Sequence, residues 1–211
     1  MPTWRKKASQ ARSKETEEAL AHSARELLST RSFSDIRVDE VARHAGISVG
    51  GFYARFNGKS ALLHLADIDF LDGCVAAFDA VIPEEFEGNL DQLLRAFITV
   101  MVQQFDKHRD TIIQIMKHAP EEDVIDFRQR ATEFNTYVHG RMRAKMALHV
   151  ADIAHQDPAI AINMTIFIAS AAARAAVLQG ALSTYPIALN LDELIEELVS
   201  NALRYLKGNA E

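Results

Sequence analysis

Residues 46–50 read Gly-Ile-Ser-Val-Gly, a spacing that presents a nucleophilic serine on a strand-to-helix turn in a large class of hydrolases. That chemistry requires a buried strand before the serine. Residues 38–45 instead repeat apolar side chains at helical spacing and carry four charged or titratable groups. The same pentapeptide fits a turn between two short helices, in which Gly46 adopts positive φ and Ser48 caps the second helix. We therefore predict a helix-turn-helix over residues 38–56, with a hydrolase as the alternative.

The second helix of this motif carries residue types suited to binding DNA. Phe52 and Phe56, four residues apart, share an inward face, and Ile47 fills the angle between the two helices. Glycine at positions 50 and 51 permits close backbone approach, and a helix N-terminus offers N–H groups to phosphate. We expect base or phosphate contacts from this helix and its surroundings, through Arg37, Ser48, Val49, Gly50, Gly51, Tyr53, Ala54, Arg55 and Lys59.

The charge of the chain is distributed unevenly. The net charge is −6, from 23 Lys and Arg and 29 Asp and Glu, but residues 1–60 hold 11 basic and 7 acidic side chains. The first segment is thus net positive, which suggests contact with a polyanion. The arm formed by Arg5, Lys6, Lys7, Arg12 and Lys14 is expected either to touch DNA or to be a solvated tail without a specific role.

Composition excludes several classes of protein. The 211 residues are 48% hydrophobic and 25% charged, which is ordinary globular usage. A single cysteine, Cys74, allows neither an internal disulfide nor a cysteine-based zinc site. No apolar run follows the basic N-terminus, so no signal peptide is predicted. The most apolar stretch, residues 159–182, is interrupted by polar side chains, which disfavours a membrane span. We expect a soluble, cytoplasmic protein.

Helical periodicity dominates the sequence, and we find no strand pattern and no internal repeat. Asn89 with Gln92 and Asn190 with Glu193 have the spacing of capping boxes, and Asp157 precedes a proline suited to the first helical position. We predict an all-α protein of about nine helices. The first predicted helix starts near residue 14, and two others are opened by Asn89 and Asn190. The remaining six cover residues 38–45, 49–56, 59–81, 110–118, 121–150 and 158–182.

Residues 14–63 resemble the TetR family of transcriptional regulators. The resemblance is carried mainly by Ala45-Gly46-Ile47-Ser48, by Gly50-Gly51-Phe52-Tyr53, and by Phe56 and Lys59 at fixed spacing. Two positions depart from the family pattern. Ser32 stands where the family usually has glycine, and Ile36 stands where a small hydroxyl residue often starts the second helix. Each departure puts a local cap or a phosphate contact in doubt.

The resemblance implies a homodimeric repressor that is released from DNA by a small-molecule effector. Residues 1–60 would form a three-helix DNA-binding domain, and residues 61–211 a helical effector-binding and dimerisation domain. Two reading helices related by two-fold symmetry would bind a palindromic operator with half-sites about 34 Å apart. Effector binding would move the helix predicted over residues 59–81. A DNA-binding protein without an effector, controlled by a partner or acting architecturally, is the alternative.

No cofactor and no metal site is predicted, because histidine pairs spaced by ten residues do not meet on one helix. Arg174 interrupts an alanine-rich stretch that suits a dimer interface or packing within the chain. Arg109, Arg128 and Arg130 join it as candidates for binding an anion. A set of apolar residues is predicted either to line an effector pocket or to belong to the core. These residues are Phe78, Phe97, Met101, Phe105, Met116, Phe127, Phe134, Tyr137 and Phe167, and Arg174 is predicted to be a polar contact of the pocket.

Overall fold

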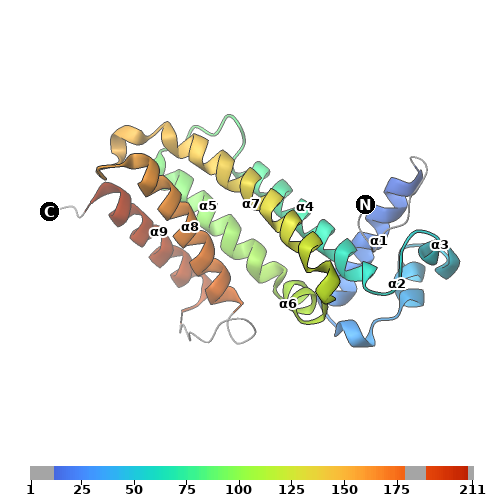
Figure 1. The fold of residues 1–211 in the computed structure, drawn as a ribbon. Coiled ribbons are helices and arrows are strands. Elements are labelled where there is room, and N and C mark those ends of the chain that lie inside the picture. The colour runs from blue at the N-terminus through green and yellow to red at the C-terminus, as the bar shows by residue number, and fades with distance from the viewer. Residues whose placement is uncertain (1–11, 179–188, 209–211) are drawn as a thin grey trace. The chain divides into compact units, whose positions relative to one another are not determined.

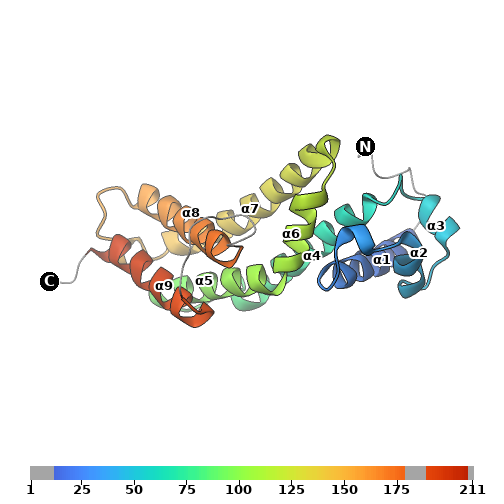
Figure 2. The same cartoon turned by 90° about the horizontal axis from the view of Figure 1, so that it is seen from below.

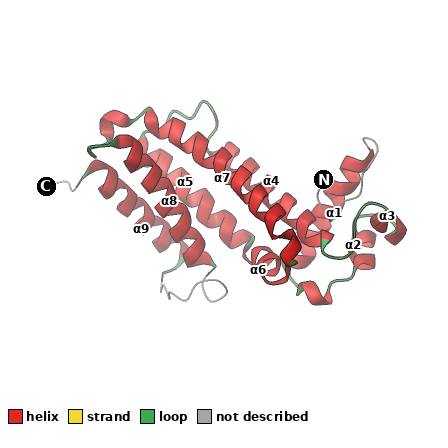
Figure 3. Ribbon diagram, in the orientation of Figure 1, coloured by secondary structure: helices red, strands yellow, loops and turns green. Residues whose placement is uncertain are grey.

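The computed structural model describes residues 12–178 and 189–208, and the described residues are helices joined by loops, without a strand (Figures 1 and 3). The all-α prediction is confirmed. The arm residues Arg5, Lys6 and Lys7 and the predicted end of the 158–182 helix lie outside the described residues. In chain order the elements are α1 (Arg12–Leu28), η1 (Phe33–Asp35), α2 (Val38–His44), α3 (Val49–Tyr53), α4 (Ala61–Val81), α5 (Leu90–Lys107), α6 (Arg109–His118), η2 (Glu121–Asp123), α7 (Val124–Ala147), η3 (Val150–Asp152), α8 (Pro158–Val177) and α9 (Leu191–Lys207), where η denotes a 3-10 helix.

The chain divides into two compact units, and α4 and α7 each contribute to both. Unit 1 comprises Met1–Gly73 and His108–Glu133, and unit 2 comprises Cys74–Lys107 and Phe134–Glu211. The functional boundary predicted after residue 60 stays a prediction. As a compact body, unit 1 extends beyond it, because the first turns of α4 and a residue of α6 share one apolar core with the helix-turn-helix.

The core of unit 1 is formed where α1, α2 and α3 pack together with the start of α4. Its side chains follow the helical spacing of the sequence, so each short helix buries one apolar face. Neither α2 nor α3 is long enough to be stable alone, and their packing against α1 and α4 therefore holds them. The largest fully buried members are Leu20, Leu28, Ile36, Phe52, Phe56, Leu62 and Leu63.

The core of unit 2 is almost wholly apolar. Helices α5, α8 and α9 each pack against the other two, and Figures 1 and 2 show them side by side. The predicted capping boxes at Asn89 and Asn190 are present, and the Asp157 side chain accepts a hydrogen bond from the backbone N–H of Ile160 at 3.0 Å. These caps satisfy backbone N–H groups at three helix starts and set where α5, α8 and α9 begin.

Among the described residues, α8 is long and apolar enough to cross a membrane by length and composition. Of its most apolar window, 44% lies buried inside the protein. The core helix of a soluble protein passes the same test, so this helix is weak evidence for a membrane span.

Candidate nucleic-acid interface

The turn between α2 and α3 has the geometry predicted for a helix-turn-helix. Gly46 has φ +71°, and the backbone N–H of Ile47 donates to the carbonyl of Ala42 at 2.8 Å. The Ser48 hydroxyl accepts a hydrogen bond from the backbone N–H of Gly51 at 3.0 Å and so caps α3. The element before Ser48 is the helix α2, not the strand that a hydrolase nucleophile turn needs. The geometry therefore favours a helix-turn-helix over a hydrolase.

Helix α3 presents one face to solvent and one to the core. Phe52 and Phe56 are 0% and 1% exposed, with ring centroids 5.0 Å apart. The α-helix ends at Tyr53, earlier than the predicted end at residue 56, and the chain continues as a turn toward Gly58, whose φ is +95°. The exposed side of this segment holds five of the predicted contact residues: Ser48, Val49, Gly50, Tyr53 and Ala54.

The two glycines of α3 have different surroundings. A Cβ atom built on Gly50 meets only the Ser48 hydroxyl oxygen, at 4.0 Å, so a side chain there would extend into open space. A Cβ atom on Gly51 lies 3.2 Å from the same oxygen and would crowd the cap of α3. Gly51 therefore also has a structural role, which the sequence pattern did not indicate.

The three predicted cations are held by local contacts. The Arg37 guanidinium pairs with Asp39 at 2.9 Å, and Arg55 donates to the carbonyl of Gly51 at 2.8 Å. The Lys59 ammonium donates to the carbonyl of Ser34 at 3.0 Å and lies 4.5 Å from the centre of the Phe33 ring. Partial burial lowers the pKa of Lys59, and the Asp35 carboxylate opposes this. An ammonium has three donors, so one bond to Ser34 leaves two.

The two departures from the family pattern have structural explanations. The Ser32 hydroxyl accepts a hydrogen bond from the backbone N–H of Ser34 at 3.4 Å and caps η1. Ile36 is 1% exposed and belongs to the core of unit 1. The Ser32 cap belongs to η1, whereas α2 begins after Arg37 without a side-chain cap, and Ile36 contributes packing instead.

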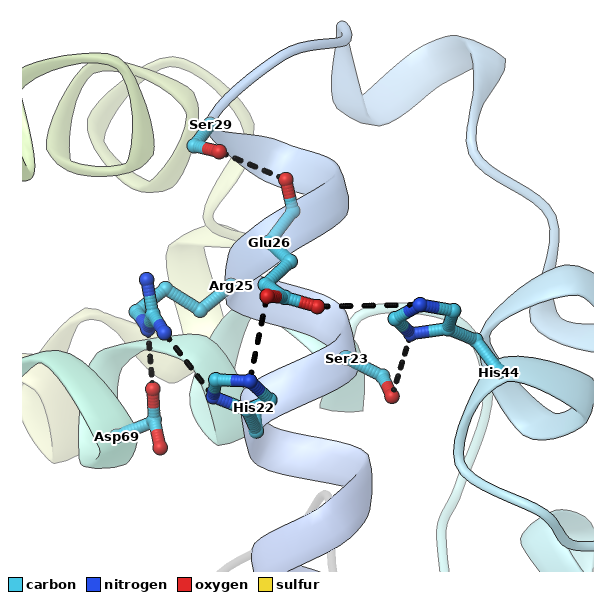
Figure 4. A network of polar contacts seen from close by, with 7 residues as sticks. All are labelled: His22, Ser23, Arg25, Glu26, Ser29, His44 and Asp69. Carbon is cyan, nitrogen blue, oxygen red and sulfur yellow. Dashed lines mark hydrogen bonds and ion pairs between the residues drawn. The ribbon is translucent and has the colours of Figure 1, made fainter.

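A polar network fixes α1 against α2 and α4 (Figure 4). The His44 ring lies 3.0 Å from the Ser23 hydroxyl and 3.8 Å from the Glu26 carboxylate, which also pairs with His22 at 3.3 Å. Arg25 forms an ion pair with Asp69 of α4. Among the described residues, no group of three His, Cys, Asp or Glu side chains could hold a metal ion. These contacts hold α2 in place and thereby support the turn that carries α3.

Comparisons with known proteins agree with this geometry. Residues 20–66 match the family described as "Bacterial regulatory proteins, tetR family". The chain is 32% identical over 109 residues to the HTH-type transcriptional regulator EthR of Mycolicibacterium smegmatis, which is 50% of this chain and 49% of that protein. Over residues 20–66 the chain is thus similar to the TetR family. The match spans about half the length of EthR.

Solved structures of regulators share the fold over most of the chain. The fatty acid degradation regulator FadR from Bacillus halodurans superposes with a TM-score of 0.62 at 13% identity, covering 94% of this chain and 97% of that one. NalD, the secondary repressor of the MexAB-OprM multidrug efflux pump in Pseudomonas aeruginosa, gives 0.61 at 17% identity, covering 93% and 100%. At these identities the likeness shows the fold alone.

The predicted pocket residues fall into two groups. In unit 2, three are buried, Phe105 and Phe134 pack at the edge of the core, and three are exposed. In unit 1, Met116 is 48% exposed, whereas Phe127 packs against the core. The buried three are Phe78, Phe97 and Met101, and the exposed three are Tyr137, Phe167 and Arg174. The ten residues therefore do not form a single cluster within either unit.

Sequence reasoning missed a buried group of ionisable residues in unit 1. His64 of α4 lies 3.1 Å from the Asp123 carboxylate and 3.1 Å from the Arg130 guanidinium, which donates to Asp67 at 2.6 Å. Arg130 was expected to be a candidate for binding an anion, and here it pairs with a carboxylate of its own chain. Burial raises the pKa of Asp67, and Arg130 opposes this. No local sequence signal links these residues, because they come from different elements.

Proposed function

We propose that this protein is a sequence-specific transcriptional regulator of the TetR family that acts in the cytoplasm. It binds a palindromic operator as a homodimer and represses transcription until a small molecule releases the protein from the DNA. The carrying observation is the capped α3 helix, whose exposed face lies beside a glycine turn of φ +71°. This geometry is the one with which a reading helix enters the major groove. The relatives described above, which are regulators, support the same function.

The residues of the interface would have different roles. Val49, Gly50 and Tyr53 are exposed on α3 and would face base edges or the adjacent sugar-phosphate backbone. Ser48 would offer its hydroxyl while it caps α3, and Ala54 would permit close approach. Arg37, Arg55 and Lys59, already oriented by contacts with their own chain, would neutralise phosphates and fix the register. Gly51 would keep the helix start narrow.

The dimer would form through α8 and α9. Six exposed side chains of α8 recur at the spacing of one helix face, and an apolar stripe of this kind marks an interaction surface. A two-fold axis along α8 would pair the stripe with its copy and complete a four-helix bundle. The stripe consists of Ile160, Met164, Phe167, Ile168, Ala171 and Ala175, and Arg174 lies at its edge. Phe167→Glu should yield monomers in sedimentation velocity, whereas Leu148→Glu, at a more exposed site outside the stripe, should not.

The effector would bind unit 2 and would be a largely apolar small molecule. The buried ring and thioether side chains Phe78, Phe97 and Met101 would contact it, and Phe105, Phe134 and Tyr137 would border it. A thermal-shift screen tests this, since a ligand of the folded state raises the melting temperature. Hits that raise the melting temperature and weaken DNA binding support the effector. A full screen without hits would favour the second candidate, a DNA-binding protein controlled by a partner or acting architecturally.

The decisive experiment is selection of bound sequences from a random DNA pool at near-physiological salt. A palindromic consensus with half-sites about one helical turn apart is expected. Gly50→Val adds a side chain in open space and should abolish enrichment without loss of stability, whereas Ile125→Val, at an exposed site outside the interface, should not. Lys59→Ala should reduce the salt slope of binding by about one unit. Folded dimer without any enriched sequence would overturn the proposal.

A further inference from the structure

Unit 1 buries a set of ionisable side chains between α4, η2 and the start of α7. His64 is 0% exposed, Asp123 is 3% exposed and Asp67 is 8% exposed. The Arg130 side chain is 18% exposed. Burial of charged groups is costly unless each one is paired and hydrogen-bonded. The arrangement of these four residues must therefore be specific to be tolerated.

The four side chains form one connected chain of contacts. Asp67 accepts from the Arg130 Nε at 2.6 Å, the Arg130 Nη2 meets the His64 Nδ1 at 3.1 Å, and the His64 Nε2 meets the Asp123 Oδ2 at 3.1 Å. The Phe127 ring stacks on His64, with centroids 4.3 Å apart and planes 7° from parallel. The same ring lies 4.9 Å from the guanidinium carbon of Arg130. The imidazole is thus fixed in position and in orientation.

This arrangement selects one protonation state of His64. A guanidinium only donates hydrogen bonds, so the His64 Nδ1 must accept from Arg130 and carries no proton. The proton of the neutral ring therefore lies on Nε2, which is 3.1 Å from the Asp123 carboxylate. A second proton on Nδ1 would face the N–H groups of Arg130. Protonation would break the link between His64 and Arg130.

The position of His64 connects this network to the DNA-binding helices. Its neighbours in sequence, Leu62 and Leu63, are 1% and 0% exposed and belong to the same core cluster as Phe52 and Phe56. A close-packed core transmits displacements, because it leaves few voids to absorb them. A change in the position of α4 at His64 is therefore expected to reach α3, which packs into the same core.

We propose that His64, Asp123 and Arg130 are positioning residues that hold α4 in its DNA-binding place while His64 is neutral, so that acidification weakens DNA binding. The inference rests on the proposed DNA-binding function. The charged groups around the ring are Asp67 on α4, Asp123 on η2, and Asp126 and Arg130 on α7.

Electrostatics agree with the geometry. Burial lowers the pKa of His64, and the charge of Arg130 lowers it further, whereas the bond to Asp123 and the charges of Asp123 and Asp126 raise it. The net direction is downward, so His64 is neutral near pH 7 and becomes charged only under more acidic conditions.

The first test reads the imidazole directly. In ¹⁵N-histidine NMR of the full chain, the His64 signal is identified by its loss in His64→Gln. We expect the Nε2–H tautomer at pH 7 and a His64 pKa below its ordinary value of 6.5. Arg130→Met should remove the tautomer preference, whereas Arg130→Lys, which keeps a donor and a charge, should largely retain it. A His64 ring whose pKa is not lowered below 6.5, or that carries its proton on Nδ1 when neutral, overturns the inference.

The second test measures affinity for the consensus DNA from the pool at pH 7.5 and pH 5.5 and constant ionic strength. Glutamine can accept from Arg130 and donate to Asp123 without titrating, so His64→Gln should bind like the wild type at pH 7.5. At pH 5.5 the wild type should bind about twofold or more weakly than His64→Gln, and the control His155→Gln, in unit 2, should behave like the wild type. Equal pH profiles of wild type and His64→Gln overturn the inference alone. If no DNA sequence is enriched, the proposed function fails and this inference falls with it.

Discussion

Unit 1 and unit 2 bury their side chains in different ways. Of the seven buried polar or charged residues in the described part of the chain, six lie in unit 1 and only Thr165 lies in unit 2. The six are Ser23, His64, Asp67, His108, Thr111 and Asp123. Unit 2 instead surrounds Phe97 and its neighbours with aliphatic and aromatic groups from α5, α7, α8 and α9. The unit that carries the candidate DNA interface thus has the more polar interior.

The difference has an energetic meaning. An apolar core gains free energy in proportion to the area that it buries, with little dependence on direction or pH. A buried polar network adds little net stability, but it is satisfied in one geometry only and becomes costly when a partner is lost. Unit 2 is therefore expected to supply stability, whereas unit 1 is expected to supply a defined arrangement of α4 and the helix-turn-helix.

The largest effect is expected in unit 2. Phe97→Ala removes a fully buried ring from the core and should lower the free energy of unfolding by about 3–5 kcal/mol, to the same extent at pH 6 and pH 8. Urea denaturation at a fixed protein concentration measures this. Leu148→Ala, at a side chain that is 75% exposed, serves as the control and should change stability by less than about 0.5 kcal/mol. A loss for Phe97→Ala as small as that of the control would contradict the description of this core.

A smaller loss is expected from the polar interior of unit 1. His64→Phe keeps an aromatic ring against Phe127 but leaves Asp123 and Arg130 without their shared partner. The free energy of unfolding should fall by about 1–3 kcal/mol, which is the cost of leaving a buried polar group unsatisfied. His64→Gln should restore most of it. If phenylalanine is tolerated as well as glutamine, the hydrogen bonds of His64 contribute nothing measurable.

The pH dependence of stability gives a further distinction between the units. Burial lowers the pKa of folded His64 below its ordinary value of 6.5, so the unfolded chain takes up the proton first. The contribution of His64 is fully present above pH 6.5 and is lost as pH falls toward the lowered pKa. Burial also lowers the pKa of His139 in unit 2. Burial raises the pKa of Asp67, which titrates at more acidic pH than the histidines. Only the difference between wild type and His64→Gln therefore isolates His64, and a difference that does not change between pH 8 and pH 5 would contradict this assignment.

The smallest expected effect is a gain. The Thr165 hydroxyl is buried in unit 2 and has no hydrogen-bond partner among the described residues. Thr165→Val replaces it by a methyl group of similar size and should raise the free energy of unfolding by about 1 kcal/mol. Thermal and urea denaturation measure the gain. A loss of stability would mean that this hydroxyl has a partner and that unit 2 is more polar inside than described.

Much of the fold could be predicted from the sequence because its signals are local. Asn89, Asp157 and Asn190 cap helices where their types and spacing predicted caps. Gly46 adopts the positive φ that the turn requires, and Ser48 caps α3. Periodicity placed the long helices correctly, although α3 ends at Tyr53. Its end depends on the turn toward Gly58, which short-range apolar spacing does not define.

The parts that could not be predicted depend on contacts between distant segments. The network of His64 joins α4 to residues about 60 positions later in the chain, and no spacing rule indicates such a pairing. Lys59 was expected to be free for phosphate, but it reaches back to the carbonyl of Ser34. Phe167 is exposed whereas Phe97 is buried, and apolar residue type alone does not determine this difference in packing.

The turn glycine of the helix-turn-helix has one further consequence, which concerns chirality. Gly46 has φ +71°, and a Cβ atom built on it would meet nothing within 4 Å. The obstacle to alanine at this position is therefore the handedness of natural amino acids and not a lack of space. A chain assembled by chemical ligation with D-alanine at position 46 should keep the turn and lose less conformational entropy on folding. In this protein, the turn adopts a backbone conformation that a mirror-image residue favours and that, among natural residues, glycine adopts without strain.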